Sequence, residues 1–362
     1  MPRFHRLTIA CAVLAFAVMA APARPASGPS TFSIVAWDSL TGEIGVAVQS
    51  KYFSVGGVVP WAEAGVGAVA TQAQVNASYG PKALAMMRAG MSPAEILRAF
   101  ESVDSLWNVR QLGIIDARGR VGSWTGSKCN DWAGSETGID FACQGNILAG
   151  PAVVSKMAHA FRDTRGELGE RLIAALEGAQ SAGGDKRGQQ SAALIVVRPS
   201  TVHPEYAHRY VDLRVEDHRA PITELRRLWH IHQGFHSAGA HMEFAREYDA
   251  AGRAELAAHE RERVHQILVG ALARGERDAS MLNGLAWACA TNGVELSDAA
   301  RAAERAAKLE PRSADILDTL AEVYFRMGRV KEAIAVETRA SAIDPKSQYL
   351  KDQIVRFRSR RP

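Results

Sequence analysis

Hydrophobic residues form short runs through the part of the chain that follows residue 30. Residues 31–37 (TFSIVAW) and 44–50 (IGVAVQS) are rich in β-branched and aromatic side chains, and a turn at 38–43 (DSLTGE) separates them. This pattern predicts two paired strands. A third run at 65–72 (GVGAVATQ) consists mainly of small residues. We interpret it as a buried strand that packs closely against another layer.

Up to residue 220, segments in which apolar residues recur at helical spacing alternate with further predicted strands. Ser92-Pro93-Ala94-Glu95 is a capping box with proline at the first helical position, so a helix is expected to start there. Blocks of strands separated by pairs of helices favour antiparallel sheets between helical layers, rather than a doubly wound parallel sheet. The remaining segments are helices over 76–88, from 150 and over 168–176, and strands over 110–126, 191–199 and 210–215.

Beyond Pro221 the strand pattern stops, and the chain shows helical spacing to its end. The segment 314–345 repeats the pattern of the segment that ends at Pro311, thirty-four residues earlier. This period, together with its residue pattern, is typical of tetratricopeptide repeats. A helix pair cannot bury its apolar face alone and must stack on a neighbour. We predict repeats over 274–362 and a helical connector or degenerate repeat over 221–273. The pattern-bearing residues are Leu317, Leu320, Ala321, Tyr324, Gly328, Ala333, Ala340 and Pro345.

The first residues have the pattern of an export signal. Positive charges at Arg3 and Arg6 precede an apolar run at 7–21, and Ala21-Pro22-Ala23 has the small-residue spacing of a cleavage site. The alternative is a membrane anchor, but about 15 residues are fewer than the roughly 20 that a spanning helix needs. We predict a signal peptide over 1–23, a linker over 24–30 and a first domain over 31–220. The protein is then expected to be periplasmic or extracellular, without a stable membrane anchor.

The composition changes this picture little. The 362 residues are 47% hydrophobic and 23% charged, which suits about two globular domains. A net charge of +4 is mild, and the basic residues are scattered except in the tail at 356–361. We interpret that tail as a solvated end and expect no nucleic-acid partner.

The cysteine and histidine residues show whether the chain could form a disulfide or bind a metal. Cys129 and Cys143 could close a short loop in an oxidising compartment, whereas Cys289 lies in an apolar helical stretch that suits a buried free thiol. His232 and His236 would share a helix face, as zinc ligands can. No cysteine is near them, so a solvated polar face is favoured. The sequence predicts no metal and no cofactor.

Thr31 is the candidate catalytic nucleophile. A threonine hydroxyl needs a base, and one solution is the residue's own free α-amino group. Thr31 begins the first predicted strand, and Lys51 follows the end of its partner strand, where it could supply positive charge. The alternative is that Thr31 is simply a β-favouring residue at the start of a strand.

Several separated motifs resemble the domain-of-unknown-function family 1028 between about Thr31 and Leu228. They are TFSIVAWDSLTGEIGVAVQSKYFSVG, GVGAVATQAQVNASYG, RQLGIIDARG, WAG…CQGNILAG and AGGDKRGQQSAALIVV. The family is grouped with the N-terminal-nucleophile (Ntn) hydrolases. The resemblance implies a four-layer αββα sandwich, and most proteins with that fold cleave amide bonds.

The same resemblance assigns roles to individual residues. Thr31 occupies the nucleophile position and Lys51 that of its charged partner. The end of the third strand falls where backbone N–H groups could form an oxyanion hole. The glycine-rich loop at 182–190 either lines the pocket or supports the fold through a tight turn. The oxyanion and pocket residues are Thr71, Gln72, Ala73, Asn146, Asp185, Arg187, Gln190 and Ser191.

Two functions remain open. Cleavage after Ala23 leaves seven residues before Thr31, so catalysis needs a second cleavage between Ser30 and Thr31. With it, the protein is an exported hydrolase acting on a small amide, ureido or peptide-like C–N bond. The alternative is a non-catalytic ligand-binding domain whose repeats serve protein–protein interaction. Folds of this kind commonly associate, so a homo-oligomer is also expected.

Overall fold

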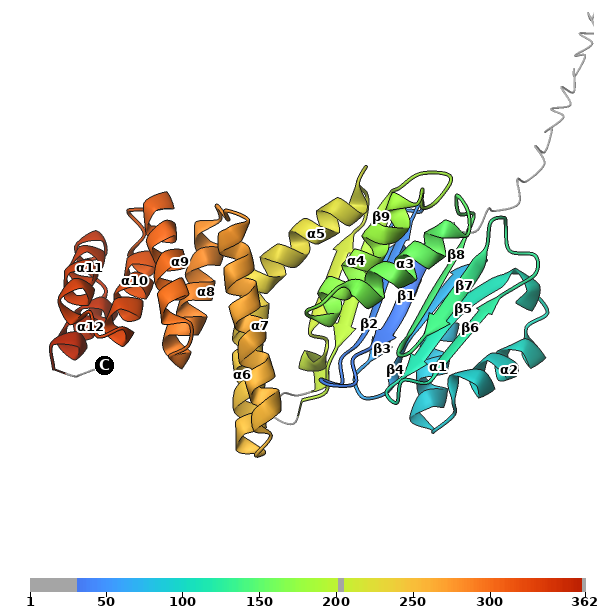
Figure 1. Ribbon diagram of the computed structural model, residues 1–362, viewed down its shortest axis with the longest axis horizontal. Coiled ribbons are helices and arrows are strands. Elements are labelled where there is room, and N and C mark those ends of the chain that lie inside the picture. Colours follow the sequence, from blue (N-terminus) through green and yellow to red (C-terminus); the bar gives the residue numbers. More distant parts are fainter. Residues whose placement is uncertain (1–30, 201–204, 360–362) are drawn as a thin grey trace, which may run out of the picture.

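The structure is a computed structural model that describes residues 31–200 and 205–359. It consists of a mixed α/β domain followed by an elongated array of helices (Figure 1). The predicted signal peptide and linker lie outside the described residues. Within the described ranges, no helix is both long and apolar enough to cross a membrane.

Two antiparallel sheets form the centre of the first domain. The first has six strands in the order β10-β9-β2-β1-β8-β7, and the second has four in the order β3-β4-β5-β6. The strands of the first sheet are β1 (Thr31–Trp37), β2 (Ile44–Ser50), β7 (Gly134–Gly138), β8 (Phe141–Asn146), β9 (Ser191–Val197) and β10 (Val211–Val215). Those of the second are β3 (Pro60–Glu63), β4 (Gly67–Ala73), β5 (Arg110–Asp116) and β6 (Val121–Thr125).

Helices cover the outer face of each sheet, so the domain has four layers (Figure 1). Buried side chains alternate between the two faces of the central strands: Ile34 packs toward α3 and α4, whereas Val35 packs toward the second sheet. The predicted αββα sandwich is therefore confirmed. The covering helices are α1 (Tyr79–Arg88), α2 (Pro93–Val103), α3 (Ala152–Asp163), α4 (Leu168–Ser181) and α5 (Pro221–His232).

The structure adds to the predicted elements of this domain. The predicted capping box is present, with Ser92 and Glu95 satisfying each other's backbone N–H groups. The helix predicted from residue 76 begins only at Tyr79, because Asn76 forms a turn by accepting a hydrogen bond from the Ser78 N–H at 3.2 Å. Strands β3, β7 and β8 were not predicted. Strand β3 is only four residues long and begins with proline, and glycines and polar residues obscure the strand pattern of β7 and β8.

The disulfide that the sequence left open between Cys129 and Cys143 is not formed in the structure, where both are free thiols. Cys143 is fully buried on the face of β8 that packs against α3 and α4. Cys129 lies on the other side of the sheet, where its Sγ donates a hydrogen bond to the Arg110 carbonyl in β5. The first sheet therefore separates the two sulfurs. The buried free thiol predicted at Cys289 is confirmed.

The second part of the chain is an array of antiparallel helix pairs. A π-helical turn at Gln233–Ser237 joins α5 to α6, and the pairs then follow one another along the array (Figure 1). The helices of the array are α6 (Ala238–Ala250), α7 (Ala254–Ala273), α8 (Ala279–Asn292), α9 (Leu296–Leu309), α10 (Ala314–Arg326), α11 (Val330–Ile343) and α12 (Gln348–Ser359). The two predicted repeats are the pairs α8–α9 and α10–α11.

An acidic pair is buried inside the second repeat. Asp318 of α10 and Glu337 of α11 are almost completely inaccessible, and Tyr349 of α12 contacts Asp318. Burial, the negative charge of Asp318 and a hydrogen bond to Asp318 raise the pKa of Glu337 to about 8. Burial likewise raises the pKa of Asp318.

Replacing Glu337 by glutamine is expected to stabilise the protein at alkaline pH. The folded state holds the Glu337 proton more tightly than the unfolded state, so its stability falls as pH rises through the raised pKa. We expect the free energy of unfolding of Glu337→Gln to exceed the wild-type value by about 1 to 3 kcal/mol near pH 9 and to match it near pH 5. Urea denaturation at both pH values measures this difference. The exposed Glu332→Gln on the same helix is the control, and equal pH dependence in wild type and Glu337→Gln would contradict the prediction.

Candidate functional site

Thr31 stands at the start of β1 with its side chain between the two sheets. In the strand register it lies opposite Ser50 of β2 and Asn146 of β8. Its hydroxyl donates a hydrogen bond to Ser50 Oγ at 3.1 Å, and its side chain is completely inaccessible to solvent. The fold thus places Thr31 in the central strand of the first sheet, at one end of the space between the sheets.

A cluster of buried polar side chains surrounds that end of the sandwich. We call it the inter-sheet amide cluster, and all its members are at most 1% exposed. Each comes from the face of its strand that points to the opposite sheet, at the position where the apolar inter-sheet core stops. Its members are Thr31, Ser33, Ser50, Gln72, Gln111, Gln144 and Asn146.

Hydrogen bonds link these side chains across the two sheets. Gln72 of the second sheet accepts from Ser33 Oγ at 2.7 Å and donates from Nε2 to Gln111 Oε1 at 2.8 Å. Asn146 Nδ2 also donates to Gln111 Oε1, at 2.9 Å. Gln144 Nε2 donates to Ser33 Oγ at 2.7 Å. The network fixes the orientation of the carboxamides around Thr31, because a buried amide without a partner is costly.

Close backbone approach makes room for the cluster. A Cβ atom on Gly113 of β5 would lie 2.3 Å from Gln144 Oε1, so any other residue would displace the carboxamide. That oxygen has no hydrogen-bond partner among the described residues. Buried polar atoms are nearly always satisfied, so Gln144 offers an acceptor inside the cluster.

Of the residues predicted from the sequence, the structure brings Thr31, Gln72 and Asn146 into this cluster. Sequence reasoning missed Ser33, Ser50, Gln111 and Gln144. A signal was available, because each of the missed residues is a polar residue on the inward face of an otherwise apolar strand. Strand pairing was needed to show that these faces meet.

Lys51 and the glycine-rich loop lie at the rim of the same end. The exposed Lys51 donates from Nζ to the Gln189 carbonyl at 3.2 Å, so the described contacts of its ammonium group are with the loop. Together with Gln190 it borders a surface hollow of about 680 Å³. The charge of Lys51 is therefore near the site but outside the cluster.

Asp185 is the residue that holds the loop in place. It is 3% exposed and accepts hydrogen bonds from the backbone N–H of Lys51 at 2.9 Å and of Arg187 at 2.8 Å. Ser191 is buried, and its hydroxyl accepts from the Val55 N–H. Gln190 binds the Ser50 carbonyl through its backbone N–H at 3.1 Å. Through these contacts, Asp185, Gln190 and Ser191 hold the loop against the rim of the sandwich.

The segment proposed for an oxyanion hole contributes a side chain. The Thr71 N–H already donates to the Val59 carbonyl at 3.1 Å, so it is not a free donor in this structure. The Thr71 hydroxyl points to the Asn76 carbonyl, on the far face of β4. Ala73 ends the strand with a left-handed backbone, φ 64°. Only the Gln72 side chain reaches the inter-sheet amide cluster.

The predicted histidine group lies at the junction of the two parts. The rings of His232 and His236 are 5.2 Å apart, beside a hollow of about 660 Å³ that Tyr210 and Phe235 also line. Burial lowers the pKa of His232 to about 4, so it is neutral at physiological pH. The solvated polar face expected here is therefore only partly correct, because His232 is half-buried while His236 is exposed.

Buried charges join the first domain to α6 and α7. Arg198, which follows β9, binds Glu43 at 3.1 Å and Glu260 of α7 at 2.7 Å, and both carboxylates are buried. His241 of α6 lies between Glu260 at 2.6 Å and Glu167 at 3.2 Å. Burial would lower the pKa of His241, but its hydrogen bonds to the two carboxylates outweigh that effect and raise it. His241 therefore serves this junction.

Comparison with known proteins finds matches for both the α/β domain and the helical array. Residues 31–225 match the model of a family described as a family of unknown function, DUF1028, and residues 295–353 match a tetratricopeptide repeat model. A crystal structure of a Silicibacter pomeroyi protein, itself assigned to DUF1028, is 33% identical. The match covers 56% of this chain and 89% of that chain, with a TM-score of 0.51. No curated protein matches the sequence.

Proposed function

Because the chain belongs to the DUF1028 family through residues 31–225, we propose that its first domain is an amide-cleaving hydrolase with Thr31 as the nucleophile. The observation that carries this proposal is the position of Thr31. Thr31 is the first residue of the central strand β1, and its side chain faces a set of buried carboxamides. Side-chain amides in a buried site can hold the negative charge that develops on a carbonyl oxygen.

The proposed chemistry proceeds in two steps once Thr31 has a free amine. Thr31 Oγ1 attacks the substrate carbonyl carbon while its proton passes to the α-amino group. The C–N bond then breaks, the proton goes to the leaving nitrogen, and an ester remains on Thr31. Water attacks the ester, with the α-amino group as base, and releases the acid. We assign the Asn146 carboxamide, opposite Thr31 in the strand register, to the oxyanion, and Gln72, whose Nε2 already donates to Gln111, to holding the cluster in place.

The proposed substrate is a small amide, ureido or peptide-like compound, because the Thr31 side chain is completely buried between the two sheets. Lys51 at the rim supplies positive charge where the substrate enters. The predicted cleavages and export belong to the same proposal, because a free Thr31 amine requires removal of the preceding residues.

The mature protein is expected to begin at Thr31. Intact mass and N-terminal sequencing of protein recovered from its native compartment test this, with protein made without residues 1–23 as the comparison. In that comparison, release of the remaining seven residues by the purified protein would indicate autocatalytic cleavage. A mature chain that begins at residue 24 would leave Thr31 without its own amine and would refute the mechanism.

One observation favours the alternative of a non-catalytic ligand-binding domain. Thr31 is completely buried and its hydroxyl is bonded to Ser50, which is also how a structural residue at a strand start would behave. In that case the tetratricopeptide repeats carry the function, since such repeats indicate protein–protein interaction. An intact N-terminus combined with partner capture by residues 238–359 would favour this reading.

A further inference from the structure

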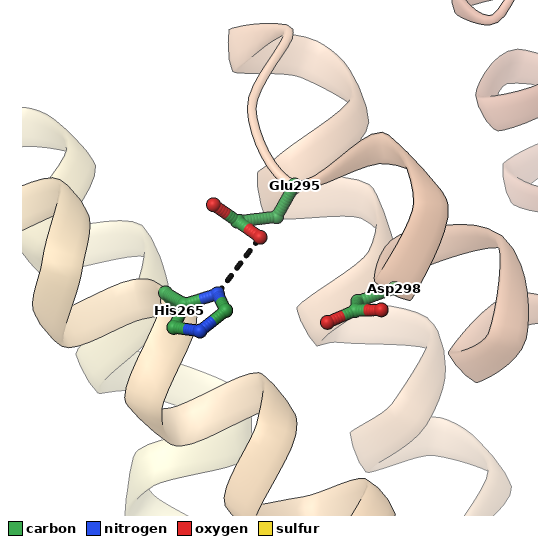
Figure 2. A group of neighbouring side chains, drawn as sticks. All are labelled: His265, Glu295 and Asp298. Atoms are coloured by element: carbon green, nitrogen blue, oxygen red, sulfur yellow. Dashed lines mark hydrogen bonds and ion pairs between the residues drawn. The ribbon is translucent and has the colours of Figure 1, made fainter.

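Three metal-binding residue types converge where α7 meets the beginning of α9. His265 comes from the middle of α7, Glu295 immediately precedes α9, and Asp298 lies in its first turn (Figure 2). One ligand atom from each lies within 4.8 Å of the other two. His265 Nδ1 and Glu295 Oε2 are 2.8 Å apart. The histidine and the carboxylates are thirty residues apart in the sequence, so the fold alone brings them together.

We propose that His265, Glu295 and Asp298 form a binding site for a divalent transition metal, with zinc as the ion that fits best. An imidazole nitrogen and two carboxylates are common zinc ligands, and three protein ligands leave a fourth position for water. Magnesium and calcium prefer oxygen ligands, and the imidazole disfavours them. The site belongs to the helical array and is separate from the inter-sheet amide cluster.

Zinc binding requires side-chain movements, in which ligand atoms that lie up to 4.8 Å apart approach one another by up to about 1.5 Å. Zinc binds nitrogen and oxygen ligands at about 2.0–2.2 Å, which places neighbouring ligand atoms about 3.3 Å apart in a tetrahedron. The proton that now joins His265 Nδ1 to Glu295 Oε2 would be replaced by the metal, and the pair would open by about half an ångström. Both side chains are more than a third exposed, so they can rotate and the ion can enter from solvent.

The charges around the site favour a cation. The carboxylates of Glu262, Glu295 and Asp298 lie near His265 and make its surroundings negative. Two features oppose a cation: Arg301 donates to Asp298 Oδ1, and the positive end of α9 lies close by. Asp298 keeps its second oxygen for a metal. Without a metal, the same acids stabilise the first turn of α9.

A bound metal would act as a clamp in the array. His265 belongs to the hairpin that is anchored to the first domain, whereas Glu295 and Asp298 belong to the first predicted repeat. Zinc would cross-link the two and stiffen the surface that the repeats present. It would stabilise the folded chain in proportion to its concentration relative to the dissociation constant.

Calorimetric titration of the tag-free full-length protein with zinc chloride tests the proposal near neutral pH. We expect uptake of one zinc ion by the wild type, at least ten-fold weaker binding in His265→Ala and Glu295→Gln, and tighter binding in Arg301→Ala. Magnesium should give no comparable uptake. The control is His159→Ala, since His159 forms an exposed pair with Asp163 without a third ligand, and its zinc binding should equal that of the wild type.

Cobalt substitution gives a second measurement. The wild type with cobalt should show the visible absorption of a four-coordinate ion, and His265→Ala should lose it, while circular dichroism shows that the variant is folded. The proposal is overturned if the wild type takes up no zinc, if His265→Ala and His159→Ala bind it equally, or if magnesium binds as well as zinc.

Discussion

Replacing Thr31 by alanine is expected to abolish hydrolysis of the amide substrate, with a loss in kcat/KM of at least about a thousand-fold. The proposed mechanism uses the Thr31 hydroxyl as its only nucleophile, and the methyl group of alanine cannot form the ester intermediate. The substitution removes one hydroxyl whose described side-chain partner is Ser50. The expected structural change is therefore small, and the loss would reflect chemistry.

The measurement is hydrolysis of a library of small amide, ureido and peptide-like compounds by protein that begins at residue 31. Thr31→Ser keeps both hydroxyl and amine and should retain measurable activity. Thr338→Ala, in the exposed part of α11, should match the wild type. Mass spectrometry should detect an acyl group on Thr31 in the wild type alone. Activity that survives in Thr31→Ala would exclude Thr31 as the nucleophile.

Replacing Arg198 by alanine is expected to have the largest effect on stability, a loss of about 3 to 5 kcal/mol. Arg198 is 1% exposed and lies between the buried carboxylates of Glu43 and Glu260. Its guanidinium carbon lies 3.7 Å from the centre of the Phe244 ring, and Nη2 donates to the Tyr248 hydroxyl. Removal would take one cation away from both buried carboxylates, leaving Arg263 near Glu43 and His241 beside Glu260, and would open a cavity beside the ring.

Urea denaturation monitored by circular dichroism measures the effect. Arg162→Ala is the matched control, because Arg162 pairs with Glu136 on the surface with half of its side chain exposed, and such pairs contribute less than about 1 kcal/mol. Arg198→Lys keeps the charge but loses the two-sided geometry and should fall between the two. Equal stabilities of Arg198→Ala and Arg162→Ala would show that the buried network does not hold the junction together.

The Arg198 prediction also concerns the junction between the two parts of the chain. Glu260 belongs to α7 and Tyr248 to α6, so the network anchors the α6–α7 hairpin to the first domain. Although burial opposes it, the hydrogen bond from His241 and the charge of Arg198 lower the pKa of Glu260 to about 2. Glu260 is thus ionised throughout the physiological range, and its contacts hold the α6–α7 hairpin against the first domain.

Local patterns in the sequence predicted much of the fold. The hairpin at 31–50, the capping box at Ser92 and the repeat period that ends at Pro345 each depend on neighbouring residues alone. For this reason antiparallel sheets between helical layers and the helical array could be expected before the structure, and the family resemblance added the αββα arrangement. The strand β7 (GSETG) was missed, since its glycines and exposed polar residues lack the alternation that identifies a strand.

The candidate site was predicted only in part. Thr31, Gln72 and Asn146 were named from family resemblance, and the structure places their side chains in one cluster. Gln111 and Gln144 were not named, although each is a polar residue near the end of an otherwise apolar strand. A polar residue in a strand can face solvent or another sheet, and the sequence does not distinguish the two.

The sequence by itself determined most of the elements, their order and the repeat, because each of these depends on side-chain periodicity and capping within a few residues. Tertiary structure alone decided which polar faces meet. Pairing β1 with both β2 and β8 surrounds Thr31 with Ser50 and Asn146, and the same sheet separates Cys129 from Cys143. Packing of α7 against α9 brings His265 to Glu295. Such meetings depend on contacts between residues far apart in the chain, whose partners no local pattern specifies.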